Sequence, residues 1–293
     1  MRLVRFLRDG RAVLGAVGEG GIVPLDGLGF GGMSEVIVGG DAALGRIRDH
    51  LADATPEIAV AGAPLLAPLE RPGKYLAIGM NYRDHAKEAQ KLGIDVPDHQ
   101  LWFNKQTTCI SGPFDDIDPG VTEKLDYEVE LGVVIGRRAK HVAEANARPY
   151  VFGYLVANDV SARDWQFHSQ TFTMGKSFDT HGPIGPWIVT ADEIDDPHDL
   201  AIRCFVNGEL RQDSNTSRLI HNIWAQIAYL STAFTLEPGD LIATGTPEGV
   251  GIALDPPLFL SEGDVVRCEI DGIGAIVNKV ARPAPVAAGG RAA

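Results

Sequence analysis

The stretch YEVELGVVIG, residues 127–136, has the composition of a buried β-strand that carries two acidic residues near its start. Side chains two positions apart in a strand project from the same face, so Glu128 and Glu130 point the same way and their apolar neighbours point the other way. Two carboxylates side by side repel each other and lose solvation unless a cation lies between them. The stretch therefore indicates either a cation site or, as the spacing alone favours, the solvated face of an edge strand.

A second apolar stretch ends in a third acidic side chain. Residues 151–159 predict another strand, and Asp159 stands at its end. Asp159 could complete an oxygen ligand set with Glu128 and Glu130. Three carboxylates with no cysteine nearby favour a hard ion, so Mg²⁺ or Mn²⁺ is expected, and Ca²⁺ also fits.

A histidine and a glutamate are spaced to interact on one helix. Residues 80–89 predict a short polar helix, with Asn81 or Asp84 as its cap. His85 and Glu88 are three positions apart, so they share a helix face and can form a hydrogen bond. A carboxylate on one imidazole nitrogen fixes the tautomer and makes the other nitrogen a better base. The alternative is a solvent-facing helix whose charges all lie on the surface.

Residues 243–251, ATGTPEGVG, form a glycine-rich loop after a β-prone run. Such a loop can present backbone N–H groups to an anion. It lacks the Lys-Ser/Thr pair of a phosphate-binding P-loop, so nucleotide binding is not indicated. A tight turn between two strands is the alternative.

The composition is that of a globular protein, and the charge limits its partners. The chain has 293 residues, of which 45% are hydrophobic and 22% charged, and its formal net charge is -13. This length and composition suffice for a sizeable core. No Lys/Arg-rich run appears, so a nucleic-acid partner is disfavoured, and an acidic surface gives no attraction to anionic lipid. An anionic substrate would have to be attracted by a local feature such as a metal or a few lysines.

Cysteine usage and the N-terminus indicate a reducing compartment. Cys109, Cys204 and Cys268 are odd in number and widely spaced, so neither a disulfide framework nor a soft-metal site is supported. The first eleven residues, MRLVRFLRDGR, carry charges where a signal peptide needs an uninterrupted apolar core. No apolar stretch approaches the ~18 residues needed to span a bilayer. We expect a cytoplasmic protein without a membrane partner.

The chain divides into three predicted regions. Residues 1–70 predict a small N-terminal β-rich domain with a short helix at 42–52. Residues 71–281 are dominated by strands and turns, with one long helix at about 218–234 where apolar residues recur at helical spacing. Residues 282–293 are rich in Pro, Ala and Gly and are expected to be disordered. The predicted fold class is mainly β with a few helices (α+β).

Taken together, these motifs resemble the fumarylacetoacetate hydrolase (FAH) superfamily. The resemblance covers about residues 73–281, with the motifs in order and at family-like spacing. Each motif alone is weak, but five in sequence are specific. The matching segments are 78–88 (IGMNYRDHAKE), 125–131 (LDYEVEL), 153–166 (GYLVANDVSARDWQ), 175–179 (GKSFD) and 237–251 (EPGDLIATGTPEGVG).

The sequence departs from the namesake branch of the superfamily at one place. That branch carries an extra aspartate metal ligand upstream of its histidine, whereas residues 76–79 of this chain offer no carboxylate. The chain instead resembles the shorter branch that uses a His-x-x-Glu pair, here His85 and Glu88. That branch includes acylpyruvate hydrolases, oxaloacetate decarboxylases and isomerases of hydroxymuconate-type diacids.

The resemblance also implies a fold and a set of site residues. It implies a rolled, barrel-like β catalytic domain over residues 71–281, usually paired into a homodimer, and a helix with His85 and Glu88 that resembles a mobile lid. Mg²⁺ or Mn²⁺ would be held by Glu128, Glu130 and Asp159. By the same resemblance, Lys176 contacts substrate oxygens, Gly245 and Thr246 of the glycine loop meet the substrate carboxylate, Arg163 and Gln166 lie near the site, and Gln212 approaches the substrate or supports a hairpin.

The resemblance therefore implies an enzyme that acts on a small 2-oxo acid. We expect hydrolysis of a C–C bond in a 2,4-dioxo acid of the acylpyruvate kind, giving pyruvate and a carboxylic acid. His85 would deprotonate the attacking water, and Lys176 or Gln166 would steady the oxyanion. The alternatives are decarboxylation of oxaloacetate, tautomerisation or isomerisation of a hydroxymuconate-type 2-oxo diacid, and a non-catalytic ligand-binding protein on the same fold.

Overall fold

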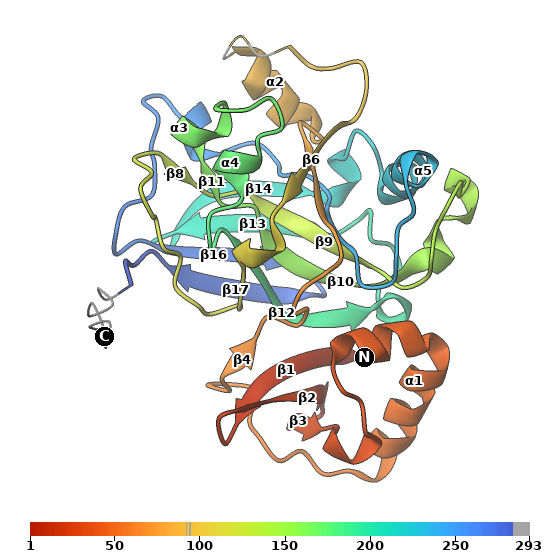
Figure 1. Ribbon diagram of the computed structural model, residues 1–293. Coiled ribbons are helices and arrows are strands. Elements are labelled where there is room, and N and C mark those ends of the chain that lie inside the picture. The colour runs from red at the N-terminus through yellow and green to blue at the C-terminus, as the bar shows by residue number, and fades with distance from the viewer. Residues whose placement is uncertain (92, 94, 284–293) are drawn as a thin grey trace, which may run out of the picture.

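Strands make up most of the regular structure, as the sequence predicts (Figure 1). The computed structural model describes residues 1–91, 93 and 95–283. The helices are α1 (Met33–Asp53), α2 (Arg83–Lys91), α3 (Arg163–Gln166), α4 (Thr173–Lys176) and α5 (Ile223–Ala233). The strands are β1 (Arg2–Arg8), β2 (Arg11–Gly18), β3 (Gly21–Pro24), β4 (Leu65–Leu66), β5 (Tyr75–Gly79), β6 (Leu101–Lys105), β7 (Ile110–Ser111), β8 (Leu125–Asp126), β9 (Val129–Ile135), β10 (Val151–Asn158), β11 (Ser161–Ala162), β12 (Gly182–Thr190), β13 (Ala201–Val206), β14 (Glu209–Asn215), β15 (Leu241–Ala243), β16 (Val265–Ile270) and β17 (Gly274–Lys279). The predicted fold class, mainly β with a few helices, is confirmed.

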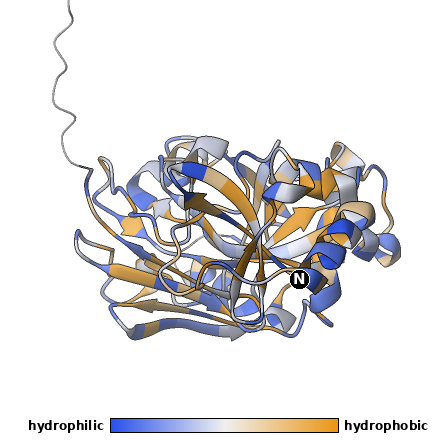
Figure 2. Cartoon of the chain, turned by 90° about the horizontal axis from the view of Figure 1, so that it is seen from below, coloured by the Kyte–Doolittle hydropathy of each residue, from blue (hydrophilic) through white to orange (hydrophobic). Residues whose placement is uncertain are grey.

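Two sheets enclose the main core. The larger sheet runs in the order β3-β2-β1-β12-β10-β9-β15-β5-β6, and the smaller runs β14-β13-β16-β17. Val129 and Leu131 of β9 belong to the same buried cluster as Ile202 and Val266 of the smaller sheet. The side chains on one face of β9 therefore pack in the core. Figure 2 shows this arrangement as hydrophobic residues running along the interior strands.

Strand pairing brings the acidic segments together. β9 and β10 are antiparallel neighbours, with Glu130 opposite Ala157 and Val129 opposite Asn158. Asp159 follows directly, and its N–H donates to the carbonyl oxygen of Glu128 at 2.9 Å. Segments about thirty residues apart in the chain thus present their carboxylates at one place.

The loops that complete the site start from two parallel strands. β15 pairs antiparallel with β9 and parallel with β5, so β15 and β5 run in the same direction. β5 leads toward α2, and β15 leads into the glycine loop at 244–251. The parallel direction of the two strands places α2 and the glycine loop at the same edge of the sheet.

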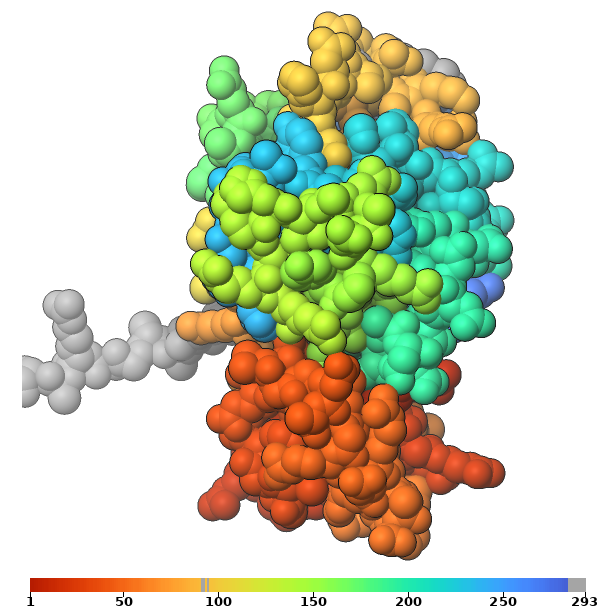
Figure 3. Space-filling model, turned by 90° about the vertical axis from the view of Figure 1, so that its right-hand side faces the viewer, coloured from red at the N-terminus to blue at the C-terminus, as the bar shows by residue number. Residues whose placement is uncertain are grey.

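The N-terminal strands extend the larger sheet. β1 pairs with β12 through Arg2 opposite Val189, besides pairing with β2 and β4. Figure 3 shows residues 1–70, in red to orange, packed against the rest of the chain. The division into domains at residue 70 stays a prediction.

The first helix is longer than the sequence predicts. α1 begins at Met33, not at residue 42, and ends at Asp53. Its buried face carries Ile37 ahead of a break and Ile47 after it. The break is at Gly40, whose φ of 50° and ψ of -134° lie outside the helical region. The glycine pair at 39–40 interrupts the apolar periodicity, so the sequence pattern predicts only the part of the helix that follows the break.

The second predicted helix is shorter than expected. α5 begins at Ile223, not near residue 218, because the Asn222 side chain accepts a hydrogen bond from the N–H of Ala225 at 2.8 Å and caps the first turn. Leu219 forms a β-bridge with Tyr82 instead, and the N–H of Ile220 donates to the carbonyl oxygen of Asn81. The apolar residues ahead of Asn222 therefore serve tertiary contacts.

The end of the chain is described only as far as residue 283. Residues 284–293 of the predicted disordered tail lie outside the described residues. Arg282, the first residue of that tail, donates a hydrogen bond to the carbonyl oxygen of Gly120 at 2.6 Å. Within the described part of the chain, no helix has the length and apolar character needed to cross a membrane.

Candidate active site

Three buried carboxylates converge where β9 begins and β10 ends. Glu128, Glu130 and Asp159 each offer an oxygen, and these oxygens lie within 4.8 Å of one another. The exposed fractions of the three residues are 5%, 1% and 0%. The solvated-edge alternative is wrong, because these side chains are in the interior. Glu128 itself lies between β8 and β9, because the strand predicted over 127–136 begins only at Val129 and ends at Ile135.

The electrostatics of this cluster suit a divalent cation. Burial would raise the pKa of Glu128, but the charges of Lys176 and Arg163 outweigh it and lower the pKa to about 2. Burial and the charges of Asp159 and Glu128 instead raise the pKa of Glu130 well above its ordinary value. Glu130 is thus a buried oxygen donor with excess negative potential around it. A cation that prefers oxygen ligands would relieve this repulsion, so the donor set fits Mg²⁺ or Mn²⁺.

Two lysines hold the third carboxylate. Nζ of Lys176 lies 2.8 Å from Oδ2 of Asp159 and 2.7 Å from Oε2 of Glu128. Nζ of Lys105 lies 2.5 Å from Oδ1 of Asp159, and both side chains of this pair are fully buried. Burial lowers the pKa of Lys176, but Asp159 and Glu128 outweigh that effect and raise it, so the side chain stays protonated.

Lys105 was missed in the sequence. It is the last residue of β6, in the stretch LWFNK, where a lysine ordinarily marks the solvated end of a strand. A predicted cluster of buried carboxylates needs buried cationic side chains as counterions, and this requirement could have pointed to Lys105.

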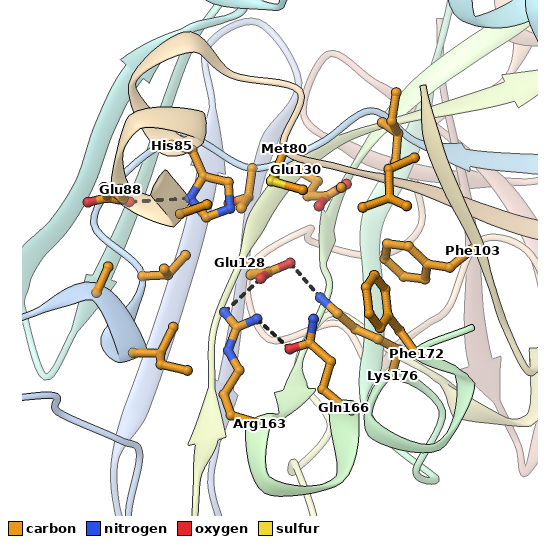
Figure 4. Close-up of a pocket in the computed structure, with 18 of the residues that line it drawn as sticks. Met80, His85, Glu88, Phe103, Glu128, Glu130, Arg163, Gln166, Phe172 and Lys176 are labelled. Atoms are coloured by element: carbon orange, nitrogen blue, oxygen red, sulfur yellow. Dashed lines mark hydrogen bonds and ion pairs between the residues drawn. The ribbon is translucent and has the colours of Figure 1, made fainter. Parts of the chain in front are cut away.

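Arg163 and Gln166 lie beside the carboxylates, as the resemblance implies. Nη2 of Arg163 lies 2.7 Å from Oε1 of Glu128, and Nη1 donates to Oε1 of Gln166 at 3.1 Å. Both residues come from the single turn of α3, which follows β11. Figure 4 shows Arg163, Gln166 and Lys176 grouped around Glu128. Arg163 is 7% exposed, so it supports the cluster from within the protein.

The histidine–glutamate pair faces the carboxylates across the pocket. Nδ1 of His85 lies 3.2 Å from Oε2 of Glu88 on α2. The second oxygen of Glu88 accepts a hydrogen bond from the N–H of Gly249 at 3.0 Å. In Figure 4 the other ring nitrogen of His85 points toward the space above Glu128. The surface-helix alternative is wrong for this face of α2, which lines the pocket.

Neither candidate cap of α2 is seen to cap it. The side-chain amide of Asn81 donates to the carbonyl oxygens of Thr244 and His221. The Asp84 side chain pairs with Lys87 and Arg218 on the surface. Asn81 thus ties the start of the helix segment to the glycine loop.

The glycine loop supports the acidic cluster. The N–H of Gly245 donates to Oε2 of Glu130 at 2.9 Å. The hydroxyl of Thr246 donates to the carbonyl oxygen of Val129 and accepts from the amide of Gln212. Gln212 also accepts from the N–H of Val129, so it links the glycine loop to β9 and is not among the residues that line the pocket. Thr246 does line the pocket, and its contact with substrate stays a prediction.

One pocket contains this machinery. Its polar lining residues are His85, Glu88, Glu128, Glu130, Arg163, Gln166, Lys176 and Thr246. Apolar side chains complete the wall, among them Met80, Phe103 and Phe172, and the rings of Phe103 and Phe172 meet edge to face with centroids 5.9 Å apart. The pocket therefore combines an oxygen-rich floor, a base positioned by a carboxylate, and walls that exclude water.

This site and fold define a class of enzyme. A family model described as "Fumarylacetoacetate (FAA) hydrolase C-terminal" matches residues 74–281, which is most of the chain. The chain belongs to this family, and the prediction of an enzyme of the FAH superfamily is confirmed.

Several relatives share most of their length with this chain. Oxaloacetate tautomerase FAHD2B, mitochondrial, of Bos taurus is 45% identical over 251 residues, which cover 85% of this chain and 79% of the relative. Oxaloacetate tautomerase fahd2, mitochondrial, of Xenopus laevis is 46% identical over 251 residues, covering 85% of this chain and 78% of the relative.

Solved structures agree over nearly the whole chain. A fumarylacetoacetate hydrolase from Exiguobacterium antarcticum superposes with a TM-score of 0.81 at 37% identity, covering 97% of this chain and 100% of that one. Maleylpyruvate hydrolase from Sphingobium sp., in complex with manganese (II) ion and pyruvate, gives a TM-score of 0.81 at 32% identity with the same coverage.

Proposed function

We propose that the protein catalyses metal-dependent keto–enol tautomerisation of a small 2-oxo acid, with oxaloacetate as the first substrate to test. The observation that carries this proposal is the His85–Glu88 pair placed across one pocket from the buried carboxylates Glu128, Glu130 and Asp159. The names of the relatives from Bos taurus and Xenopus laevis, at 45% and 46% identity, support oxaloacetate.

The charge of the site supports an anionic substrate only when a cation is bound. Three carboxylates, those of Asp126, Glu128 and Asp159, pair with three cationic side chains, those of Lys105, Lys176 and Arg163, and Glu130 adds a fourth carboxylate with no ion-pair partner among the described residues. A divalent ion adds two positive charges, so the site becomes net positive whether or not Glu130 carries a proton. When bound, Mg²⁺ or Mn²⁺ would act as a Lewis acid toward the carboxylate and 2-oxo oxygens of the substrate.

The chain's own residues can move the proton. Glu88 accepts from Nδ1 of His85, which leaves Nε2 with a lone pair to remove a proton from C3 of the substrate. The C3–H electron pair then forms the C2–C3 double bond, and the 2-oxo oxygen takes up the charge. Lys176, which stays protonated, can donate a proton to that oxygen. The reaction balances, because the substrate loses one proton from C3 and gains one on its 2-oxo oxygen.

Proton exchange at C3 provides the test. The protein with Mn²⁺ is mixed with oxaloacetate in D₂O, and NMR follows the C3 signal and the keto and enol forms. Exchange and interconversion faster than with Mn²⁺ alone, with pyruvate and CO₂ appearing no faster than in that control, would support a tautomerase. Release of pyruvate and CO₂ faster than with Mn²⁺ alone would instead identify a decarboxylase, and the absence of any acceleration over that control would contradict the proposal.

C–C bond hydrolysis of a 2,4-dioxo acid is the second candidate. It uses the same groups, with His85 deprotonating a water that attacks the 4-oxo carbon. The similarity to a maleylpyruvate hydrolase holding manganese and pyruvate favours it. Release of pyruvate and a carboxylic acid from an acylpyruvate, faster than tautomerisation of oxaloacetate, would make hydrolysis the main activity.

Assembly and location stay predictions. We propose a homodimer that acts on a small 2-oxo acid without a nucleic-acid or membrane partner. A cytoplasmic location also stays a prediction, and the bovine and frog relatives carry the word mitochondrial in their names.

A further inference from the structure

Asp126 is a buried carboxylate that lies behind the pocket and not in its lining. Four donors converge on it. Oδ1 accepts from the N–H of Tyr127 at 2.9 Å and from the N–H of Gly251 at 2.7 Å. Oδ2 accepts from the N–H of Ile252 at 3.0 Å and from Nε of Arg163 at 2.8 Å. Each oxygen accepts two hydrogen bonds, so the carboxylate is fully used as an acceptor.

One side of Asp126 fixes Arg163. Because Nε is held by Asp126, the far end of the guanidinium is free to reach Glu128 at 2.7 Å and Gln166 at 3.1 Å. Asp126 therefore orients Arg163 from behind, and it does so without lining the pocket itself.

The other side of Asp126 fixes the turn at residues 249–252. A Cβ atom on Gly251 would lie 2.2 Å from the carbonyl oxygen of Leu258 and 2.7 Å from Oδ1 of Asp126, so only glycine allows this approach. Two residues earlier, the N–H of Gly249 donates to Glu88 at 3.0 Å. Val250 and Ile252 of the same turn line the pocket. The turn held by Asp126 is thus the surface on which Glu88 docks.

We propose that Asp126 is a positioning residue: it holds the 249–252 turn where Glu88 docks, and thereby orients His85 toward the substrate. This inference rests on the proposed function, since it concerns the base of that reaction. Asn at this position keeps the size, and its oxygen can still accept from Nε of Arg163, but its NH₂ group then faces the N–H of Gly251, so the turn loses one of its two hydrogen bonds to this side chain.

The test is a double-mutant cycle with Glu88. Asp126→Asn should lower kcat for the tautomerisation about tenfold, in keeping with loss of part of an acid–base contribution, while KM and the Kd for Mn²⁺ change less than about threefold. In a Glu88→Gln background the same substitution should lower kcat by less than about twofold, since the contact it supports is already weakened. Asp240→Asn is the matched control, because its buried carboxylate also accepts from a cationic side chain, Lys74, and from a backbone N–H, that of Glu237, but is not among the residues that line the pocket.

A second measurement does not depend on turnover. Amide hydrogen exchange in α2 should quicken in Asp126→Asn and not in Asp240→Asn, with global stability monitored by urea unfolding. If Asp126→Asn does not fold, Gly251→Ala pushes the turn away from Leu258 and Asp126 while the carboxyl group itself is retained, and it should show the same pattern.

Two results would overturn the inference. One is a double variant whose decrease in kcat equals the product of the decreases in the two single variants. The other is unchanged amide exchange in α2 of a folded variant. Failure of the proposed function looks different, because the unmodified protein would then be inactive on 2-oxo acids while the exchange test could still be read.

Discussion

Nδ1 of His85 lies 3.2 Å from Oε2 of Glu88, one helical turn away on α2. Because the other oxygen of Glu88 is held by Gly249, the carboxylate cannot swing away from the histidine without leaving the glycine loop. The orientation of the imidazole is therefore set by α2 and the glycine loop together. The base and the acidic cluster come from different elements, so each can be altered separately.

His85→Ala should abolish turnover and leave metal binding nearly intact. General-base catalysis is worth about 10²- to 10⁴-fold, so we expect kcat to fall by at least about 100-fold. Calorimetric titration should give a Kd for Mn²⁺ within about threefold of the unmodified protein, because His85 belongs to α2 and not to the carboxylate set. His99→Ala, at an exposed position, is the control. Equal activity of His85→Ala and the unmodified protein would show that His85 is not the base.

Glu130→Gln should lose both metal and activity. Gln keeps the size of the side chain but removes the charge of a buried ligand, and the N–H of Gly245 still has an oxygen to bind. We expect the Kd for Mn²⁺ to rise at least about 100-fold, with activity recovered only at very high metal concentration, if at all. Chelation should likewise inactivate the unmodified protein, with recovery on adding Mg²⁺ or Mn²⁺. Retention of tight Mn²⁺ binding by Glu130→Gln would remove it from the ligand set.

Lys105→Met should destabilise the metal-free protein. It leaves Asp159 with one buried counterion instead of two, and breaking a buried ion pair from one side costs about 3–5 kcal/mol. Urea unfolding measures the loss, and Lys279→Met at an exposed position should change stability by less than about 0.5 kcal/mol. Saturating Mn²⁺ should restore part of the loss, since the ion supplies positive charge at the same place. An equal effect of the two substitutions would contradict the role assigned to Lys105.

His181 should make stability depend on pH. Burial and the charge of Lys105 lower its pKa from the ordinary value to about 3, and Nε2 contacts the carbonyl oxygen of Asp118 at 3.0 Å. The unfolded chain binds a proton near pH 6.5 and the folded protein does not, so stability is complete above about pH 6.5 and falls below it. The loss attributable to His181 should reach about 2 kcal/mol by pH 5. His181→Gln should remove this part of the pH dependence in urea unfolding; an unchanged slope would show that other groups cause it.

The sequence was most informative where residue spacing has a direct geometric meaning. Alternation along a strand predicted that Glu128 and Glu130 share a face, and helical spacing predicted that His85 meets Glu88. The end of a second predicted strand suggested Asp159 as a further ligand, and the resemblance to a family supplied Lys176; the closeness of these two residues depends on how β9, β10 and α4 pack. Spacing alone cannot give such contacts, because they join segments that are distant in the chain.

Other features depend on tertiary contacts that no local pattern encodes. The start of α5 was placed too early because Leu219 and Ile220 continue the apolar periodicity, although they pair with the segment before α2. Lys105 and Asp126 went unassigned for the opposite reason, since isolated charged residues are usually at the surface. Their burial follows from the need of each charge in the cluster for a partner of opposite sign.

The pairing of Glu130 with Ala157 links metal binding to the correct alignment of β9 and β10. If β9 slid by a single position against β10, Leu131 would face the pocket and Glu130 would be driven into the apolar interior. Misaligned chains would thus have no place for the ion, and manganese retained through gel filtration would report the fraction of molecules whose strands are correctly aligned.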